Sequence, residues 1–260
     1  MTQTLEFPAL LRLIDERSVA FRAAVASAPG LDAKVPTCPE WTLRDLVLHL
    51  GGVHRRWAAI VTTGAAETPP VGKTAEFAST APEEREALLA WSAESTEQLL
   101  GALRESGPDR GCWTWWDGSQ SPHTSGAVAR HQVQEATVHT YDAQITAGAP
   151  QPLPAEAALD GVEEFLFTCC ATTTSAWPHE PAVVEYHATE GRSWRVTLSA
   201  DGARSIPLSV PGTTPAADAS ARGTAGELVL ALYDRIPMDS LHVDGDRRLF
   251  DQLQAWDPDA

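Results

Sequence analysis

Residues 42–63 read TLRDLVLHLGGVHRRWAAIVTT, and this stretch predicts a long amphipathic helix. Thr42 is a favourable N-cap residue, and Asp45 follows three residues later as in a capping box, where Glu or Gln is more usual. His49 lies between apolar neighbours one turn away on either side and therefore points toward the buried face. That face is formed by side chains at helical spacing, which continue until Gly64 ends the helix: Leu43, Leu46, Val47, Leu50, Val53, Trp57 and Ile60.

Three more helices are expected in the first part of the chain. The apolar spacing predicts them over residues 5–28, over 82–105 and after Ser125 as far as Thr146. The intervening residues 65–81 and 106–124 have the composition of loops. Four helices joined in this way are typical of a four-helix bundle, which we expect over residues 1–150.

The pattern changes after the proline-rich stretch APQPLPA at residues 149–155. Short alternating segments separated by Gly-containing turns predict strands among helices, so residues 151–260 are expected to form a smaller α+β domain. The expected elements are a helix over 154–171, strands over 182–188, 193–198 and 204–210, a helix over 224–233, a short strand over 241–243 and a helix over 247–255.

The charge balance excludes some classes of partner. The chain has 19 basic and 35 acidic residues, which gives a formal net charge of −16. A protein of this charge lacks the basic surface that phosphate backbones or anionic membranes require, so we expect neither nucleic acid nor membrane as a partner. The sequence shows no apolar run of membrane-spanning length and no signal peptide at its start. The four cysteines have no CxxC spacing, so a cytoplasmic, reduced protein is expected.

One helix carries a constellation of possible metal ligands. Glu135 and His139 lie one turn apart on the helix that ends near Thr146, so both can reach one metal ion. His49, pointing inward from another helix, can supply a third ligand, and three protein ligands leave a position open for catalysis. Asp142 is a candidate acceptor that orients His139. His131 lies about 12 Å along the axis from His139 and is a weaker candidate.

The same residues have less specific interpretations. A Glu and a His at this spacing occur by chance in many helices, and a single inward His49 is more often a hydrogen-bonded core residue. His54 faces away from His49 and suits a surface or interhelical role. The tryptophans of residues 113–116 either line a substrate entrance or, as we favour, pack the loop onto the bundle.

Three stretches carry a resemblance to a known family. Residues 35–55 (VPTCPEWTLRDLVLHLGGVHR), 135–143 (EATVHTYDA) and 222–235 (RGTAGELVLALYDR) resemble the signatures of the actinobacterial mycothiol-dependent maleylpyruvate isomerase family. The resemblance extends over nearly the whole chain. It implies a DinB-like four-helix bundle that holds a divalent metal, followed by a smaller, sterol-carrier-like α+β domain. It also implies that the metal ligands are His49, Glu135 and His139.

The resemblance implies a chemistry as well. Zinc, which suits imidazole and thiolate ligands, would bind a low-molecular-weight thiol, mycothiol, as the thiolate. An enzyme that adds this thiolate to an electrophilic small molecule would act as an isomerase or as an S-transferase. A non-catalytic protein that binds a metal or an apolar ligand, and a hydrolase that uses metal-bound water, remain alternatives. Arg55, Arg56 and Arg130 could offset the unfavourable net charge if the substrate were anionic.

The resemblance also assigns a functional arginine to the second domain. By register from Gly223 this residue is Arg235, a candidate for catalysis and for cofactor binding. The alternative is that Arg235 is a cation near the C-terminal end of a helix, where it would interact with the helix dipole. The sequence favours neither interpretation.

Overall fold

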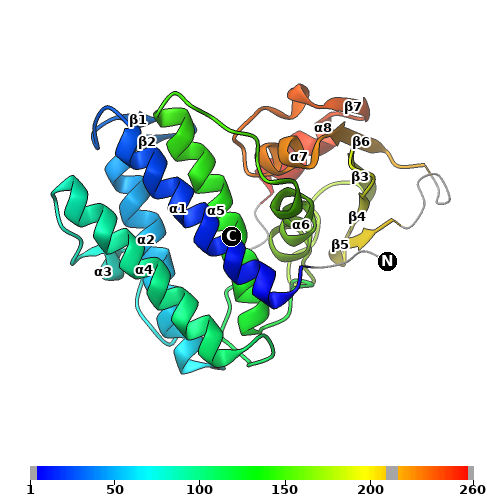
Figure 1. Cartoon of the computed structure of the whole chain (residues 1–260). Coiled ribbons are helices and arrows are strands. Elements are labelled where there is room, and N and C mark those ends of the chain that lie inside the picture. The colour runs from blue at the N-terminus through cyan, green and yellow to red at the C-terminus, as the bar shows by residue number, and fades with distance from the viewer. Residues whose placement is uncertain (1–4, 209–215, 257–260) are drawn as a thin grey trace. The chain divides into compact units, whose positions relative to one another are not determined.

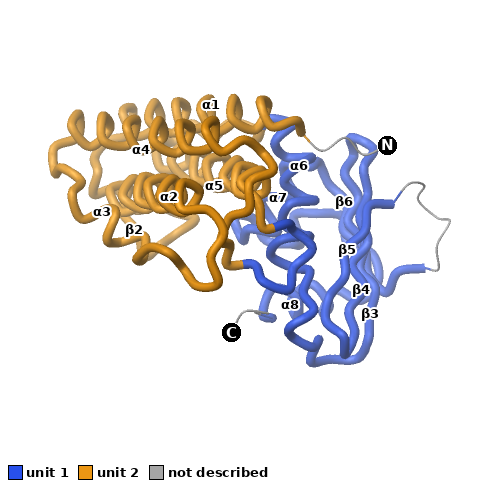
Figure 2. Tube along the Cα trace, turned by 90° about the horizontal axis from the view of Figure 1, so that it is seen from below, with its two compact units in different colours: residues 1–4, 116–122, 154–260 blue, residues 5–115, 123–153 orange. Residues whose placement is uncertain are grey.

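The computed structural model describes residues 5–208 and 216–256 and divides into two compact units. The bundle unit comprises residues 5–115 and 123–153, and the C-terminal unit comprises residues 116–122 and 154 onward (Figure 2). The chain therefore enters the C-terminal unit for a short segment before the last bundle helix begins. Among the described residues, none of the helices combines the length and the apolarity needed to cross a membrane.

Four long helices build the bundle unit (Figure 1). α1 packs against α4 and α5, and α2 packs against α4 and α5, so that the apolar stripes of all four face one another. The predicted bundle is thereby confirmed. The helices are α1 (Phe7–Ser27), α2 (Leu43–Thr63), α4 (Arg85–Ser106) and α5 (Ser125–Thr146).

The predicted cap of α2 is present. The backbone amide of Asp45 donates to the Thr42 hydroxyl oxygen at 3.2 Å, and the Thr42 amide donates to the Asp45 carboxylate at 2.8 Å. Each side chain thus satisfies a backbone group that the helix leaves unpaired. This reciprocal cap fixes where α2 begins, and with it the turn on which His49 lies.

The core of the bundle is formed by residues from all four long helices. Several of its side chains are completely buried, including Phe21 and Val25 of α1, Leu46 of α2 and Leu88 of α4. Ala143 of α5 belongs to the same cluster. Ala143 directly follows Asp142 in the sequence, so the packing of this core also holds the turn of α5 that carries Asp142.

The bundle unit also contains three short elements that the sequence did not predict. β1 (Lys34–Val35) and β2 (Cys38–Thr42) form an antiparallel hairpin before α2, and α3 (Thr74–Ala78) follows α2. A two-residue strand and a strand that contains Pro39 lack a readable alternation, which explains why the sequence did not predict them. α4 begins at Arg85 rather than near Pro82 because the Glu84 side chain caps it, accepting from the amide of Ala87 at 3.0 Å.

The C-terminal unit is built on a five-stranded sheet in the order β5-β4-β3-β6-β7. β3 pairs with β4 and β4 with β5 in antiparallel fashion, whereas β3 and β6 are parallel, and β7 is antiparallel to β6. The predicted α+β class is confirmed. The strands are β3 (Ala182–Ala188), β4 (Ser193–Ser199), β5 (Gly202–Pro207), β6 (Ala219–Gly223) and β7 (His242–Gly245).

Helices precede and follow this sheet in the sequence. α6 (Ala155–Phe165) continues into a π-helical turn, η1 (Leu166–Cys170), so the predicted helix over 154–171 is real but changes type near its end. α7 (Ala225–Leu232), the 3-10 turn η2 (Met238–Ser240) and α8 (Arg248–Ala255) complete the unit. β6 was not expected because its sequence, ASARG, has no large apolar side chain. Residues 209 and 210 of the third predicted strand lie outside the described residues.

Candidate metal centre

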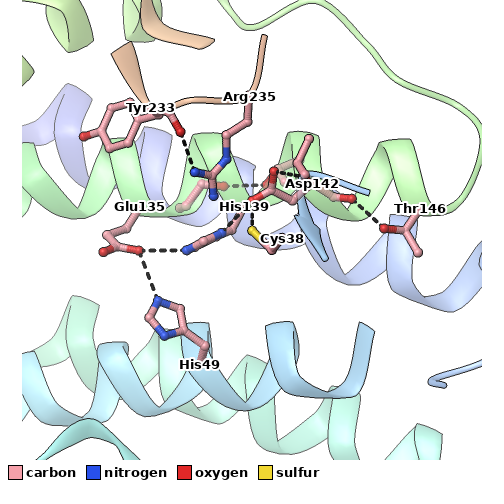
Figure 3. Close-up of polar contacts among 11 residues, drawn as sticks. Cys38, His49, Glu135, His139, Asp142, Thr146, Tyr233 and Arg235 are labelled. Atoms are coloured by element: carbon pink, nitrogen blue, oxygen red, sulfur yellow. Dashed lines mark hydrogen bonds and ion pairs between the residues drawn. The ribbon is translucent and has the colours of Figure 1, made fainter. Parts of the chain in front are cut away.

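His49, Glu135 and His139 come together in the bundle unit. Each offers one ligand atom, and the three atoms lie within 4.8 Å of one another. Glu135 and His139 are one turn apart on α5, and His49 faces them from α2 (Figure 3). The predicted grouping of the three side chains is therefore present, built from two helices that the bundle core holds together.

One carboxylate oxygen lies at the centre of this group. Glu135 Oε2 is 3.2 Å from His139 Nε2 and 3.7 Å from His49 Nε2. The same oxygen is buried and has no hydrogen bond of normal geometry. A buried acceptor without a partner is costly, so the arrangement is incomplete as a hydrogen-bonded network. Two imidazole nitrogens and a carboxylate oxygen are also normal zinc ligands, and the residues present therefore fit a divalent metal.

Asp142 fixes the orientation of His139. Its Oδ2 atom lies 2.8 Å from His139 Nδ1, and its Oδ1 atom accepts a 2.6 Å hydrogen bond from the Thr37 hydroxyl. The Cys38 thiol also contacts Oδ2, at 3.9 Å. With the proton of His139 on Nδ1, facing the carboxylate, the lone pair of Nε2 is directed toward Glu135. This is how carboxylates commonly orient metal-binding histidines.

The electrostatics of the group favour a positive charge. Burial opposes ionisation of Glu135, but the facing imidazoles of His139 and His49 outweigh it and hold the pKa of this carboxyl well below its usual range. Burial likewise opposes protonation of His139, but Asp142 and Glu135 outweigh it and raise its pKa to about 9. An ionised carboxylate that faces two imidazoles attracts a cation, which can be a proton or a metal ion.

Trp41, which the sequence did not single out as a site residue, lies against both histidines. Its ring centroid is 4.7 Å from that of His49 and 6.0 Å from that of His139. Thr37 directly precedes β2 and Trp41 lies in it, so this region supplies the ring beside the two histidines and the hydroxyl that donates to Asp142. Both residues are within the family-like stretch 35–55, but without the hairpin nothing in the sequence shows that they reach the ligands.

The remaining histidines of the bundle have other neighbours. His54 is buried, and its Nδ1 lies 3.3 Å from the Thr96 hydroxyl of α4, so it occupies an interhelical position rather than the surface. His131 is buried against the ring of Trp115, with centroids 5.6 Å apart. Neither belongs to the group of three ligand atoms found among the described residues.

The tryptophan-rich loop divides between the two units. Trp113 stacks on Trp57 of α2, with centroids 6.3 Å apart, and Trp115 packs on α5 through His131. Trp116 is 1% exposed and belongs to the C-terminal unit. These contacts are those of rings used for packing, the interpretation that the sequence favoured.

The arginines near the ligands in sequence have their own partners. Arg55 donates to Glu94 at 2.9 Å and to the Ser95 hydroxyl, and Arg56 donates to the carbonyl of Gly72. Arg55 is therefore neutralised locally, which leaves it poorly suited to bind an anionic substrate.

Arg235 lies in the C-terminal unit, just beyond α7. Its Nη1 donates to the carbonyl of Tyr233, the residue that caps the C-terminal end of this helix, at 2.6 Å (Figure 3). This hydrogen bond is the contact expected of a cation at a helix end. A role in catalysis or in cofactor binding stays a prediction.

Comparisons with known proteins identify both parts of the chain. The family model of the mycothiol maleylpyruvate isomerase N-terminal domain matches residues 11–144, and that of the MDMPI C-terminal domain matches residues 156–252. A search of curated proteins found no match.

Two solved structures have a similar fold. A crystal structure of the mycothiol-dependent maleylpyruvate isomerase aligns with a TM-score of 0.59 and 14% identity, over 94% of this chain and 96% of that one. A histidine-to-alanine mutant of that isomerase aligns with a TM-score of 0.60 and 13% identity, over the same shares of the chains. Such low identity establishes the fold alone, whereas the family models together span most of the sequence. The chain belongs to the mycothiol maleylpyruvate isomerase family.

Proposed function

We propose that this protein is a metal-dependent enzyme that uses a low-molecular-weight thiol, mycothiol, to attack an electrophilic small molecule, as an isomerase or an S-transferase. The observation that carries the proposal is the convergence of His49, Glu135 and His139 within 4.8 Å. Family membership supports the choice of thiol, because the solved relatives are described as mycothiol-dependent. We further propose that the enzyme acts in the cytoplasm, where its four free cysteines would stay reduced.

We propose His49, Glu135 and His139 as the ligands of the metal, with Zn²⁺ the best match to this donor set. Bound there, zinc would lower the pKa of a coordinating thiol and so supply a thiolate at neutral pH. Asp142 would keep the proton of His139 on Nδ1 and its Nε2 free to bind. Glu135 would contribute the negative charge that holds a cation in a partly buried site.

The cysteines of the chain support an external thiol as the nucleophile. Burial raises the pKa of Cys112 to about 11 and that of Cys170 to about 12, so neither is a thiolate at neutral pH. The Cys38 thiol is directed at the carboxylate of Asp142, with its sulfur 3.9 Å from Oδ2. A reaction that needs a thiolate is therefore better served by a thiol that the enzyme binds.

Metal titration tests the ligand set. We expect the purified protein to bind Zn²⁺ or Co²⁺ in a 1:1 complex, and each of His49→Ala, Glu135→Ala and His139→Ala to weaken binding by at least about a hundredfold, since three ligands provide nearly all of the affinity. The exposed His242, which lies in the other unit, provides the control variant His242→Ala. If the wild-type protein binds neither metal, the proposal fails.

The Co²⁺ form then tests the thiol. We expect mycothiol to change the visible spectrum of the bound Co²⁺, as a new sulfur ligand does, and a thioether analogue that cannot ionise to leave it unchanged. A spectrum unaffected by mycothiol would refute the thiol mechanism while preserving the metal site, and would favour a hydrolase that uses metal-bound water or a protein that only binds metal. Activity toward electrophiles with and without an isomerisable double bond separates isomerase from transferase.

Arg235→Gln distinguishes the two interpretations of Arg235. If Arg235 binds the thiol or the substrate, the variant should raise KM or lower kcat by about tenfold or more while the melting temperature stays near that of the wild type. If Arg235 only completes the end of α7, activity should persist, and stability should fall by about 0.3–1 kcal/mol. The second result would remove Arg235 from the proposed site.

A further inference from the structure

The C-terminal unit contains a cavity that the proposed chemistry does not use. Its volume is about 350 Å³, and all of its lining residues belong to this unit, in α6, η1, β3, α7 with the two residues that follow it, and the segment from η2 to Trp256. Pockets that bind small molecules have volumes of about 300–1,000 Å³ and are mostly apolar. The cavity is therefore large enough for a small organic molecule.

The π-helical turn η1 forms one wall of the cavity. Leu166, Cys169 and Cys170 lie in this turn and all line the cavity. A π-helical turn is wider than an α-helical one, rare, and frequently found at functional sites. In this turn two adjacent thiols both line the same cavity.

Aromatic rings form much of the remaining wall. Phe165 and Tyr233 pack edge to face with centroids 4.9 Å apart, and Tyr186 and Phe250 do so at 5.7 Å. All four rings line the cavity. Rings in such pairs present both faces and edges to an enclosed molecule, which favours a planar aromatic ligand.

The charge of the lining excludes anions. None of the described lining residues is basic. The carboxylate of Asp234 lies at the cavity and accepts a 2.7 Å hydrogen bond from the amide of Gln254. Burial raises the pKa of Cys170, so its thiol is neutral and offers only a weak, polarisable contact. An uncharged ligand suits these groups, whereas a carboxylate or sulfonate would meet a negative charge with no cation to balance it.

We propose that the C-terminal unit binds an uncharged, planar aromatic small molecule in this cavity. The ligand would lie among the rings of Phe165, Tyr186, Tyr233 and Phe250, in contact with the thiols of Cys169 and Cys170. This binding site is distinct from the metal ligands of the bundle unit in its residues and in the chemistry that it recognises. It does not depend on whether the thiol mechanism is correct.

Two fluorescent probes that differ by one charge test the proposal on the full-length protein. N-phenyl-1-naphthylamine is uncharged, and 8-anilinonaphthalene-1-sulfonate has the same ring system with a sulfonate. We expect saturable 1:1 binding of the uncharged probe, at least about tenfold tighter than that of the sulfonate. Absence of saturable binding, or equal affinity for both probes, would overturn the proposal.

A cavity-filling variant locates the probe. Cys169→Phe should weaken binding of the uncharged probe by about tenfold or more, because the added ring occupies the cavity. The matched control is Ala59→Phe, which places the same ring at a shallow hollow on the bundle unit. Equal loss in both variants, or loss in the control alone, would place the probe elsewhere and refute the site.

Alkylation of the wild-type protein gives an answer even if Cys169→Phe does not fold. Cys169 and Cys38 are both half-buried thiols, one at the cavity and one in the bundle unit. We expect the uncharged probe to slow the reaction of N-ethylmaleimide with Cys169 at least about fivefold, as judged by mass spectrometry of the peptides, and to leave Cys38 unchanged, since only an occupied cavity shields its own thiol. Equal protection of both cysteines, or protection of neither, would contradict binding in the cavity.

Discussion

At the scale of single residues, the candidate site depends on the carboxylate of Asp142 as well as on the three proposed ligands. Asp142 is completely buried and receives hydrogen bonds from Thr37 and His139 on its two oxygens. A neutral side chain of the same shape cannot attract the Nδ1 proton as strongly, and an amide nitrogen placed there would repel it. The orientation of His139 should therefore be sensitive to the charge at position 142.

We expect Asp142→Asn to weaken Zn²⁺ binding by about tenfold to a hundredfold, the usual effect of losing such a partner. Competition with a chromophoric chelator measures this affinity. Thr37→Val, which removes only the hydrogen bond to Oδ1, should have a smaller effect in the same direction. Asp239→Asn, at an exposed position in the C-terminal unit, serves as the control. Unchanged affinity in Asp142→Asn would show that this residue does not position His139.

His54 predicts a pH dependence of stability. His54 Nδ1 lies 3.3 Å from the Thr96 hydroxyl, and His54 Nε2 is buried without a hydrogen bond. Burial lowers the pKa of His54 to about 4, and the charges of Arg22, His49 and His139 act in the same direction against the opposing effect of Glu135. The folded protein therefore excludes a proton that the unfolded chain accepts.

The folded-state pKa of His54 is below the ordinary value of 6.5. The contribution of neutral His54 to the stability of the folded protein is therefore complete above pH 6.5 and is lost as the pH falls from 6.5 toward 4. We expect the free energy of unfolding to fall by about 2–3 kcal/mol over this window from His54 alone. His54→Gln removes the titration and keeps a group that can bond to Thr96. Urea unfolding at several pH values should show a flatter profile for the variant, and parallel profiles would disprove the role of His54.

At the scale of elements, the sequence predicted the long helices well because each carries both a periodic apolar face and an end signal. α2 matches its predicted bounds because Thr42, Asp45 and Gly64 mark its ends. The sequence did not predict the hairpin of β1 and β2 or the strand β6. Their stability comes from neighbours in space rather than from an alternation of apolar and polar residues in their own sequence. The three proposed ligands could be named from helix spacing and family resemblance, whereas Thr37 and Trp41 reach the site only through that hairpin. The boundary between domains at residue 150 stays a prediction.

The packing of α2 on α4 predicts the effect of replacing a glycine at their contact. A Cβ atom added at Gly51 would lie 2.1 Å from the ring of Trp91 on α4, closer than any real contact, whereas a Cβ added at Gly101 of α4 meets nothing within 4 Å. Both glycines are inside helices, so both gain helix propensity on replacement by alanine. Gly51→Ala should nevertheless destabilise the protein by about 1–3 kcal/mol because the buried Trp91 ring must shift or the two helices must separate.

Gly101→Ala provides the matched control. It should stabilise the protein by about 0.4–1 kcal/mol, since the only change is a less flexible backbone in the unfolded chain. Thermal or urea unfolding of the two variants measures the difference. If Gly51→Ala were as stable as Gly101→Ala, the close approach of α2 and α4 at Trp91 would be wrong. Because α2 carries His49, a loss of zinc affinity in Gly51→Ala alone would also show that this packing sets the position of the ligand.

At the scale of the whole molecule, the two units are not simply the two halves of the sequence. Residues 116–122 precede α5 but belong to the C-terminal unit. Gln120 connects this segment to the unit by three hydrogen bonds. Its side-chain amide donates to the carbonyl of Ser205 at 2.8 Å, and its side-chain carbonyl accepts from the Ser205 amide at 2.6 Å. Its backbone amide donates to the carbonyl of Phe167. The side chain thus pairs with β5 as a neighbouring strand would.

We expect Gln120→Ala to destabilise the C-terminal unit by about 1–3 kcal/mol, because it leaves two backbone groups of Ser205 without partners. Hydrogen exchange should accelerate at the Ser205 amide and spare the amides of α2, whereas Gln98→Ala, an exposed glutamine of α4, should change neither. A fragment that begins at residue 154 lacks Gln120 altogether and should show the same rapid exchange at Ser205. Slow exchange at that amide, in the fragment or in Gln120→Ala, would mean that β5 is held by the sheet alone and that the inserted segment is dispensable to the unit.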